Sequence, residues 1–331
     1  MGEILIVGMG SVGRRHRANL RALGWNDICC YRTGRSSLPD IDLLDTPIVR
    51  DLDQALARRP QAVVIANPTA CHLPVALAAA RAGAHLLIEK PVSHDLAGVA
   101  ELEAEVGARR LSVLVGFQFR FHPGLRQLRS WIRSGAIGTV VSAQAHWGEY
   151  LPDMHPWEDY RDGYAARPDL GGGVLLTLCH PFDYLRWLVG DIEDIAAIAS
   201  RRDSLGLAVE TAVDAVLQFE NGASGHVHVD FVQRPPEHRL SIIGTEGTVT
   251  WNQADHAARL FSVATNRWAV VAPPPAFERN AMFLDEMRHF LACLRGEEQP
   301  LCTLADGRAA LATVESAKRA IRDTAPAGQP S

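Results

Sequence analysis

A glycine-rich turn directly after an apolar run at the N-terminus constrains the fold more than any other feature of the sequence. Residues 3–7 read EILIV, and residues 8–13 read GMGSVG. A stretch with helical character follows, from Ser11 to about Leu23, and Gly24 ends it. This order of strand, G-x-G-x-x-G turn and helix predicts a βαβ unit that binds a dinucleotide.

The residues of the turn have separate predicted roles. Gly8 makes the tight turn, Gly10 lets backbone N–H groups approach a pyrophosphate, and Gly13 allows the helix to pack closely on the strand. Ser11 and Val12 lie in the first helical turn, whose positive end favours a phosphate. These five residues are therefore predicted to bind the cofactor. The alternative is an ordinary tight turn.

Strand and helix signals continue to alternate as far as residue 120. Alternation of this kind argues for a parallel sheet with helices on both faces. The predicted fold class is therefore α/β, with a Rossmann dinucleotide-binding domain over residues 1–120. The further strands are expected at 27–31, 62–66, 85–89 and 111–117, and the further helices at 52–59, 70–82 and 95–109.

The end of the second strand bears on the identity of the cofactor. A site that prefers NAD usually has an acidic residue there, which binds the ribose 2′-hydroxyl. This sequence has Arg32 and Thr33 instead, while Asp27 precedes the strand and Asp40 lies well past it. Arg32 can bind a 2′-phosphate as a fork donor, with the hydroxyl of Thr33 or Ser36 beside it. NADP(H) is therefore favoured and NAD(H) stays open, with a solvated loop arginine as the alternative.

Three polar segments follow the ends of later strands. Ligands of doubly wound sheets bind beyond the carboxyl ends of the strands, so these segments are predicted to line the cofactor crevice. Lys90 then stands at the rim of a nicotinamide pocket, although a solvated lysine at a strand end is the plainer interpretation. Thr69 is also expected to cap the next helix. The segments are Asn67-Pro68-Thr69, Glu89-Lys90-Pro91 and Gln118.

The pattern changes beyond residue 139. Extended, often alternating segments separated by turns such as Asn221-Gly222 predict a large, mostly antiparallel sheet with one face on a core. The other face is expected to be exposed or buried in an oligomer. Two helices, at about 280–295 and 304–322, close this second α/β domain, which is assigned to residues 121–331 for substrate binding and oligomerisation.

The segment 171–190 reads GGGVLLTLCHPFDYLRWLVG and carries a candidate catalytic histidine. One helix is predicted after the three glycines, with Thr177, His180 and Tyr184 on one face and the leucines buried elsewhere. Asp183 lies one turn after His180 and would orient it as an acid/base group. The alternative is a structural histidine that pairs with Asp183.

The loop at 148–170 is rich in aromatic and charged side chains and lacks apolar periodicity. Such side chains suit a polar ligand with hydroxyls and an anionic group, and Arg161 and Arg167 favour an acidic or phosphorylated one. A surface loop held by its aromatic side chains is the alternative. No metal is expected, because Asp153, His155 and His180 lack metal-ligand spacing. The predicted substrate-binding residues are Arg120, His155, Trp157, Arg161, Tyr164, Thr177 and Asp183.

Composition narrows the class of protein. With a net charge of −5 and scattered basic residues, nothing in the sequence indicates a nucleic-acid or membrane partner. The apolar runs are far shorter than the roughly 20 residues of a membrane span, and no signal peptide is recognised. Six cysteines without metal or disulfide spacing indicate a reducing, cytoplasmic compartment.

Together these motifs resemble the glucose–fructose oxidoreductase/inositol dehydrogenase/MocA family over nearly the full length. The resemblance implies a dinucleotide domain followed by a domain whose sheet forms dimers or tetramers. It also implies hydride transfer to or from a hydroxyl or keto carbon of a sugar, polyol or nucleotide-sugar derivative, and it adds His72 to the cofactor residues. The motifs that carry it are GMGSVG, Asn67-Pro68-Thr69 with His72, Glu89-Lys90-Pro91, and GGG followed by His180-x-x-Asp183.

The same resemblance assigns catalytic roles to Lys90 and His180. His180 is the expected general acid/base, and Lys90 is expected to orient the hydroxyl and stabilise negative charge, although the reverse assignment stays open. Many relatives carry an aspartate a turn before this histidine, where the present chain has Thr177. That departure supports a second hypothesis, a catalytically weak NAD(P)-binding regulatory protein. A redox-neutral reaction with a bound cofactor is a third.

Overall fold

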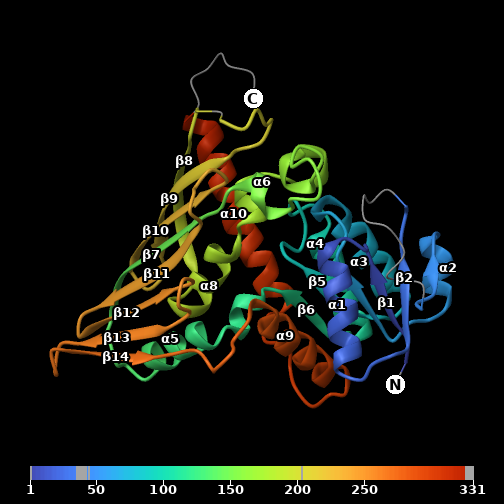
Figure 1. Ribbon diagram of the computed structural model, residues 1–331, viewed down its shortest axis with the longest axis horizontal. Coiled ribbons are helices and arrows are strands. Elements are labelled where there is room, and N and C mark those ends of the chain that lie inside the picture. The colour runs from blue at the N-terminus through green and yellow to red at the C-terminus, as the bar shows by residue number, and fades with distance from the viewer. Residues whose placement is uncertain (1, 35–42, 44, 203, 325–331) are drawn as a thin grey trace. The chain divides into compact units, whose positions relative to one another are not determined.

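A computed structural model describes residues 2–34, 43, 45–202 and 204–324 of the chain (Figure 1). Ser36 and Asp40 lie outside these residues. The described chain forms two compact units. The first contains residues 2–118, 169–171 and 278–311, and the second contains 119–168, 172–277 and 312–324. The chain thus leaves the first unit after Gln118 and contributes two later segments to it.

The first unit is built on a six-stranded sheet in which all neighbouring strands are parallel. The strand order is β3-β2-β1-β4-β5-β6, so the chain proceeds in opposite directions on either side of β1. This is the order of a Rossmann fold, in which the ligand crevice opens where the order reverses. The strands are β1 (Ile4–Val7), β2 (Ile28–Tyr31), β3 (Ile48–Val49), β4 (Ala62–Ile65), β5 (His85–Glu89) and β6 (Val113–Gly116).

Helices cover this sheet, which is why its central strands are apolar throughout. All four residues of β1 and all four of β4 are fully buried. Helix α1 packs against α9, and α3 packs against α4 (Figure 1). The predicted Rossmann fold is therefore confirmed, although the short strand β3 was not anticipated. The helices are α1 (Ser11–Ala22), α2 (Leu52–Ala57), α3 (His72–Arg81), α4 (Val99–Arg109) and α9 (Arg279–Leu294).

The second unit is built on an eight-stranded sheet with the order β14-β13-β12-β11-β7-β10-β9-β8. Its neighbouring strands are antiparallel except for β7 and β10, which run parallel. The predicted mostly antiparallel sheet is thus confirmed. The strands are β7 (Val140–Gly148), β8 (Ile192–Ala199), β9 (Ala212–Phe219), β10 (Ser224–Asp230), β11 (Glu237–Gly244), β12 (Gly247–Asn252), β13 (Ala258–Ser262) and β14 (Arg267–Val271).

The two faces of the eight-stranded sheet differ in burial. Alternate residues of β9 from Val213 to Phe219 are buried, as expected for a strand with one face on a core. Helix α5 packs on β12 and β13, and α8 packs on β7. The opposite face, called the outer face below, carries polar side chains and exposed apolar ones such as Ile198 and Val216. The helices are α5 (Pro123–Arg133), α6 (Leu151–Met154), α7 (Val174–Thr177), α8 (His180–Leu188) and α10 (Leu304–Thr324), the last shared by both units.

The single helix predicted after the three glycines is wrong. Two short helices, α7 and α8, occupy the segment, and the helical geometry is interrupted at Leu178. Pro181 explains the interruption, because it has no N–H to donate to the carbonyl of Thr177 four residues earlier. Thr177, His180 and Tyr184 therefore do not share one helical face. All three are buried, as are the leucines around them.

The predicted cap at Thr69 is also wrong. Thr69 lies inside a 3-10 turn, Thr69–Cys71, in which the N–H of Cys71 donates to the carbonyl of Pro68. Cys71 is the N-cap residue of α3, and no side-chain cap bond is formed there. Because Thr69 is part of this 3-10 turn, it does not cap α3.

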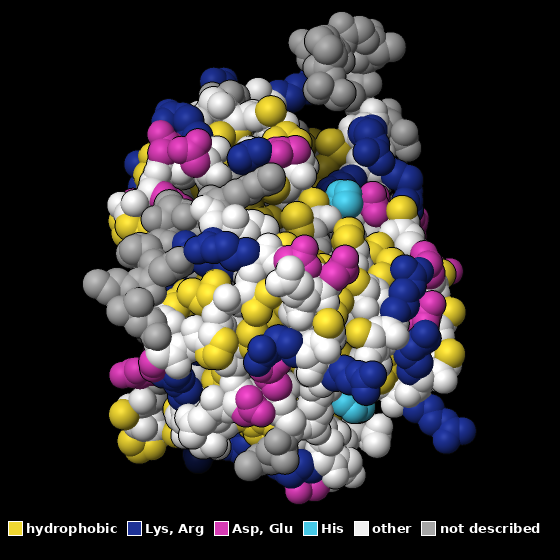
Figure 2. Space-filling model, turned by 90° about the vertical axis from the view of Figure 1, so that its right-hand side faces the viewer, with side chains coloured by type: hydrophobic (Ala, Val, Ile, Leu, Met, Phe, Trp, Pro, Cys, Tyr) yellow, Lys and Arg dark blue, Asp and Glu magenta, His cyan; other side chains and the backbone are white. Residues whose placement is uncertain are grey.

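Charged side chains of both signs are mixed on the surface. On the face drawn in Figure 2, the described Lys and Arg side chains lie interspersed with Asp and Glu. Such mixing sets up no large field of a single sign over that face. Among the described helices, none is both long enough and apolar enough to cross a lipid bilayer.

Candidate functional site

Close packing in the first unit explains two glycines of the N-terminal turn. A Cβ on Gly8 would lie 2.5 Å from the backbone nitrogen of Asn67, and Gly8 has a φ of 89°. A Cβ on Gly13 would lie 1.9 Å from the carbonyl oxygen of Gly8. At Gly10, by contrast, no described atom lies within 4 Å of a Cβ position. Gly10 therefore borders the open space through which a phosphate can approach the backbone.

The N-terminus of α1 offers backbone donors without a side-chain cap. Gly10 is the N-cap residue, no side-chain cap bond is formed, and the first turn holds no acidic residue. Ser11, Val12 and Gly13 begin the helix, and the first N–H groups of a helix have no partner within it. An uncapped, positive helix end of this kind fits a pyrophosphate.

Arg32 is buried at the end of β2. It is 6% exposed, and its backbone N–H donates to the carbonyl of Val49 at 3.0 Å. The alternative of a solvated loop arginine is therefore wrong. Thr33 beside it is exposed. The structure thus places a guanidinium at the strand end that meets the adenosine ribose in Rossmann folds.

Two amide oxygens near the carboxyl ends of β4 and β6 are buried without a partner. Asn67 Oδ1 follows β4 and Gln118 Oε1 follows β6, and neither accepts a hydrogen bond from the residues that the structure describes. Unpaired buried acceptors of this kind are uncommon in folded proteins. The carboxamide and ribose hydroxyls of a dinucleotide are donors that would satisfy them, so this edge of the sheet fits the cofactor.

His72 connects the ends of β4 and β5. Its Nδ1 lies 2.8 Å from the carbonyl oxygen of Pro91, and its Nε2 lies 2.8 Å from that of Asn67. Burial lowers the pKa of His72, although both carbonyl contacts act in the opposite direction. A neutral ring donates to only one of the two carbonyls at a time. His72 therefore holds the two loops of the cofactor edge in place, and Thr69 between them is buried as well.

Lys90 follows β5 and is half-buried, and the Lys90–Pro91 peptide is cis. Lys90 and Lys318 are the only lysines among the 33 Lys and Arg residues of the sequence. A chain that otherwise uses arginine for its cations has kept an ammonium group here. An ammonium is compact, donates in three directions and changes its pKa readily, whereas a guanidinium stays charged. A count of lysines alone would have reduced the candidates to this residue and Lys318.

Glu89 precedes Lys90 and points into the protein. Glu89 Oε1 lies 2.7 Å from His16 Nε2, and Glu89 Oε2 accepts a hydrogen bond from the backbone N–H of Lys90 at 3.3 Å. His16 is fully buried and Glu89 is 7% exposed. Direct cofactor contact by Glu89 stays a prediction, because the contacts that the structure shows for its carboxylate go to His16 and to the backbone of Lys90. Glu89 thereby supports the backbone at Lys90.

A second carboxyl group, that of Glu286 on α9, joins this pair. One ligand-capable atom of each of His16, Glu89 and Glu286 lies within 4.8 Å of the others, and Glu286 is fully buried. Burial and then the charge of Glu89 raise the pKa of Glu286 well above its usual range. Burial acts to raise the pKa of Glu89 too, but the hydrogen bond and charge of His16 outweigh it and lower that pKa. The two shifts have opposite directions, so the proton of this carboxyl pair is favoured on Glu286 and the charge on Glu89. The sequence analysis missed Glu286.

His180 begins α8 in the second unit and is held between aromatic rings. It is 1% exposed, its ring centroid lies 4.9 Å from that of Phe119 in an edge contact, and it lies 5.4 Å from that of Trp147. Thr177, the last residue of α7, is buried too. Aromatic contacts on two sides fix the plane of the imidazole, which suits a group that must transfer a proton along one direction.

Arg120 and Asp183 form a buried ion pair with each other. Arg120 Nε donates to Asp183 Oδ2 at 3.1 Å, and an Arg120 terminal nitrogen donates to Asp183 Oδ1 at 2.7 Å. Their side chains are 3% and 1% exposed. Both residues were predicted to bind substrate. The ion pair joins the segment of Phe119 to α8, the helix that His180 begins, and substrate binding by the two residues stays a prediction.

The loop between β7 and α7 carries four of the predicted substrate-binding residues, of which His155 and Trp157 are in contact. His155 stacks on Trp157 with a centroid distance of 5.0 Å, and Arg161 forms an ion pair with Asp159. The Trp157 residue is 53% exposed, and the Arg161 side chain is 59% exposed. Tyr164 begins a 3-10 turn and is half-buried. The loop therefore presents an aromatic ring and a cation to solvent.

Comparison with known proteins agrees with this architecture. Residues 3–117 match an oxidoreductase family with an NAD-binding Rossmann fold, and residues 125–250 match the GFO/IDH/MocA C-terminal domain. The chain is 29% identical to 1,5-anhydro-D-fructose reductase of Ensifer adhaerens over 76% of this chain and 74% of that protein. It is 25% identical to myo-inositol 2-dehydrogenase of Thermotoga maritima over 97% of this chain and 96% of that protein.

Solved structures share the fold at lower identity. Levoglucosan dehydrogenase in complex with NADH and levoglucosan superposes with a TM-score of 0.86 at 18% identity and covers 98% of each chain. GenD2 in complex with NAD superposes with a TM-score of 0.81 at 23% identity. Because both halves match one family in order along the sequence, this chain belongs to the GFO/IDH/MocA oxidoreductases, whose N-terminal domain is an NAD-binding Rossmann fold.

Proposed function

We propose that this oxidoreductase transfers a hydride between NAD(P) and a hydroxyl or keto carbon of a sugar, polyol or nucleotide-sugar derivative. The named relatives act on anhydrofructose and on inositol, which are substrates of this class. The observation that carries the proposal within this chain is Lys90, one of two lysines, after the strand whose end borders the cofactor edge. Such an ammonium can stabilise charge on an alcohol oxygen.

The residues of the chain would divide the chemistry as follows. A nicotinamide bound at the cofactor edge would supply the acceptor or donor of the hydride that leaves or returns to the carbinol carbon. His180 takes the hydroxyl proton as the hydride leaves and gives it back in the reverse direction. Lys90 donates a hydrogen bond to the same oxygen and stabilises its negative charge. Arg120 and Asp183 keep His180 in position, and Glu89 supports the backbone of Lys90.

The finer features of the site are part of the same proposal. NADP(H) is the preferred cofactor, supported by the buried Arg32 and by the absence of an acid among residues 31–34, the described residues at this strand end. An anionic substrate is supported by the exposed Arg161. A reducing, cytoplasmic compartment is supported by six free cysteines, five of them buried.

We also propose that a second copy of the chain covers the apolar part of the outer face around Ile198 and Val216. Ile198 is 67% exposed there and Val216 is 58% exposed, an apolar character that favours a protein interface. Light scattering on the purified chain is expected to show a dimer or tetramer. A monomer at all concentrations, or an unchanged assembly in Val216→Asp, would contradict this interface.

Turnover of Lys90→Ala tests the central assignment. With NADP and NAD offered in parallel to a panel of inositols, aldoses, uronic acids and nucleotide sugars, we expect nicotinamide reduction by the wild type. Lys90→Ala should lower kcat by on the order of 10²–10³ while the Kd for the cofactor is nearly unchanged. Lys318→Ala removes the other lysine and should behave as the wild type.

Two outcomes would contradict the proposal. Equal losses in Lys90→Ala and Lys318→Ala would show that the effect does not belong to the cofactor edge. Tight NADPH binding without turnover of any compound would favour the catalytically weak regulatory protein. Equal turnover of neutral and acidic sugars would refute the anionic substrate alone.

A further inference from the structure

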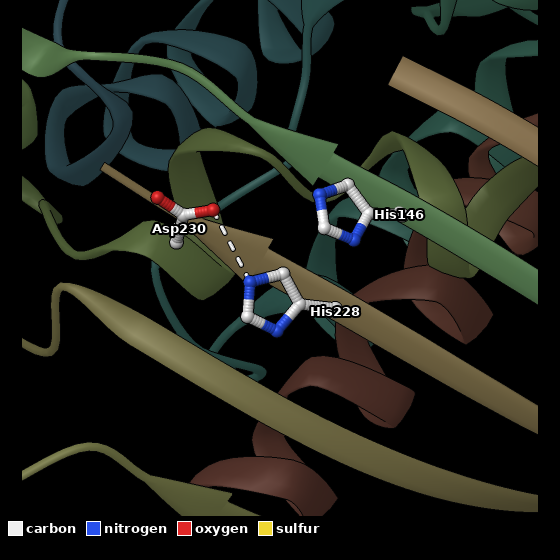
Figure 3. A group of neighbouring side chains, drawn as sticks. All are labelled: His146, His228 and Asp230. Atoms are coloured by element: carbon white, nitrogen blue, oxygen red, sulfur yellow. Dashed lines mark hydrogen bonds and ion pairs between the residues drawn. The ribbon is translucent and has the colours of Figure 1, made fainter. Parts of the chain in front are cut away.

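We propose that the second unit binds one divalent transition-metal ion, such as Zn²⁺, through His146, His228 and Asp230 (Figure 3). His146 belongs to β7, and the other two belong to β10. One ligand-capable atom of each lies within 4.8 Å of the others. The site is separate from the proposed hydride transfer and involves none of the residues assigned to it.

The pairing of β7 and β10 brings the three side chains together. The strands are parallel neighbours, and their register sets His146 directly opposite His228. Side chains two residues apart on a strand share a face, so Asp230 projects on the same side as His228. The residue opposite Asp230 is Gly148. A Cβ on Gly148 would lie 2.3 Å from Asp230 Oδ2, so the carboxylate occupies the space that this glycine leaves.

Asp230 is fixed before any ion binds. It is 3% exposed, and its Oδ1 accepts backbone hydrogen bonds from Val232 at 2.7 Å and from Gln233 at 2.6 Å. Its Oδ2 lies 3.2 Å from His228 Nε2. Two ligands of a tetrahedral zinc ion are separated by about 3.4 Å, given bonds of about 2.0–2.2 Å. This oxygen and this nitrogen therefore already have the separation that one ion requires.

Neighbouring side chains orient both imidazoles. His228 Nδ1 lies 2.8 Å from Asp214 Oδ1, and donation to that carboxylate leaves Nε2 of the neutral ring with its lone pair. Carboxylates orient metal-bound histidines in this way. His146 Nε2 lies 2.6 Å from Gln233 Oε1, and donation there leaves Nδ1 with the lone pair. The two rings are stacked with centroids 4.7 Å apart.

The donor set selects the class of ion. Two imidazole nitrogens and one carboxylate oxygen suit Zn²⁺ and its transition-metal neighbours, whereas Mg²⁺ and Ca²⁺ prefer oxygen alone. A hollow of about 330 Å³ opens beside the group and is lined by His146, His226 and Arg239 among others. It would admit a hydrated ion and leave a water molecule as fourth ligand. The alternating HVHVD at 226–230 is the sequence signal for the site.

Stoichiometric metal binding by the full-length, tag-free chain tests the proposal. After treatment with EDTA, the chain is dialysed against ZnCl₂ and its zinc content is measured by mass spectrometry. We expect one ion per chain in the wild type and a loss of affinity of at least about tenfold in each of His146→Gln and His228→Gln. His226→Gln is the matched control, because His226 shares the strand, the face and Asp214 but not the group, and it should retain the ion.

Two further measurements distinguish the loss of the metal site from a loss of folding. Zinc should raise the Tm of the wild type by roughly 5 °C and leave that of His228→Gln unchanged, with all proteins first compared in EDTA. Co²⁺ should show the visible absorbance of a tetrahedral site in the wild type, and Asp230→Asn should abolish it. Zinc bound equally by the wild type and both histidine variants, no stoichiometric zinc, or half an ion per chain would each overturn the single-chain site.

Discussion

The His16, Glu89 and Glu286 group of the first unit and the His146, His228 and Asp230 group of the second both join imidazole to carboxylate, and the two groups differ in their access to water. His16 and Glu286 in the first unit are 0% exposed. In the second unit, the His228 side chain is 23% exposed and that of Asp214 is 60% exposed. Without water, two carboxylates cannot both stay ionised, so Glu286 holds its proton. The ion pairs of His228 are thus partly exposed, and the hydrogen bond to Asp230 leads in raising the pKa of His228.

Residue type alone does not decide the chemistry of a group of histidines and carboxylates. In the enclosed group the carboxyl of Glu286 is neutral, and the charge is confined to the contact between Glu89 and His16. In the outer group the carboxylates of Asp214 and Asp230 contact the two ring nitrogens of His228, and backbone N–H groups hold Asp230 in place. A fully buried group of this kind therefore favours a bound proton, whereas a partly exposed group favours a cation that can exchange with solvent.

The largest expected difference comes from removing one imidazole from each group. His16→Leu leaves the buried carboxyl of Glu89 without its partner, so we expect the free energy of unfolding to fall by about 3–5 kcal/mol. His228→Gln in EDTA should lower it by less than about 1 kcal/mol, because its ion pairs are partly exposed. Urea unfolding of both variants measures the contrast. Similar losses would mean that enclosure does not distinguish the groups.

A smaller effect should appear in the pH dependence of stability. The folded-state pKa of Glu286 is raised, so above the ordinary glutamate pKa the folded state binds more protons than the unfolded state. Its contribution to stability is therefore present at low pH and is lost as the pH rises toward the folded pKa, by at most about 1.4 kcal/mol per pH unit. Glu286→Gln removes this dependence.

Unfolding of the wild type and of Glu286→Gln between about pH 5 and about pH 8 measures this loss as a difference between two curves. We expect the variant to gain stability relative to the wild type as the pH rises. Parallel curves would show that Glu286 is ionised in the folded protein and that the enclosed group holds two charged carboxylates.

The smallest effect on stability is expected for His226, which lies next to the outer group. His226 Nε2 lies 3.2 Å from Asp214 Oδ1, and the two side chains are 46% and 60% exposed. Solvent screens such a pair, so His226→Gln should change the free energy of unfolding by less than about 0.5 kcal/mol. Calorimetry in EDTA measures it. A loss as large as that of His16→Leu would place His226 in a tightly coupled network that the structure does not show.

The fold was predictable where the signal is local. A few neighbouring residues are enough to predict the glycine turn at 8–13, the apolar strands and the alternation of β9. Pro181 was visible as well and would have predicted the interruption between α7 and α8. The packing of residues 278–311 with the first unit was not predictable, because an apolar helix face does not specify its partner.

The residues of the candidate site likewise divide into those that local sequence signals predict and those that depend on distant pairing. Lys90 and Gln118 could be placed because parallel strands present their carboxyl ends at one edge. The pairing of Arg120 with Asp183 joins residues 63 apart in the sequence, and each looks like a free polar group by itself. Glu286 lies in a helix with no local sign of burial next to Glu89. His146, the third residue of the proposed metal site, lies on β7. Only the pairing of β7 with β10 places it opposite the HVHVD segment.

The scarcity of lysine makes this protein a convenient subject for chemical footprinting. An amine-directed reagent has two side-chain targets in the whole sequence, Lys90 and Lys318. Lys318 lies on α10 and is paired with the neighbouring Glu315, so its rate of acylation is an internal standard within each molecule. The ratio of the two modified peptides reports the accessibility of Lys90 alone. Protection by added nucleotide could then be followed by peptide mass spectrometry without knowing the substrate.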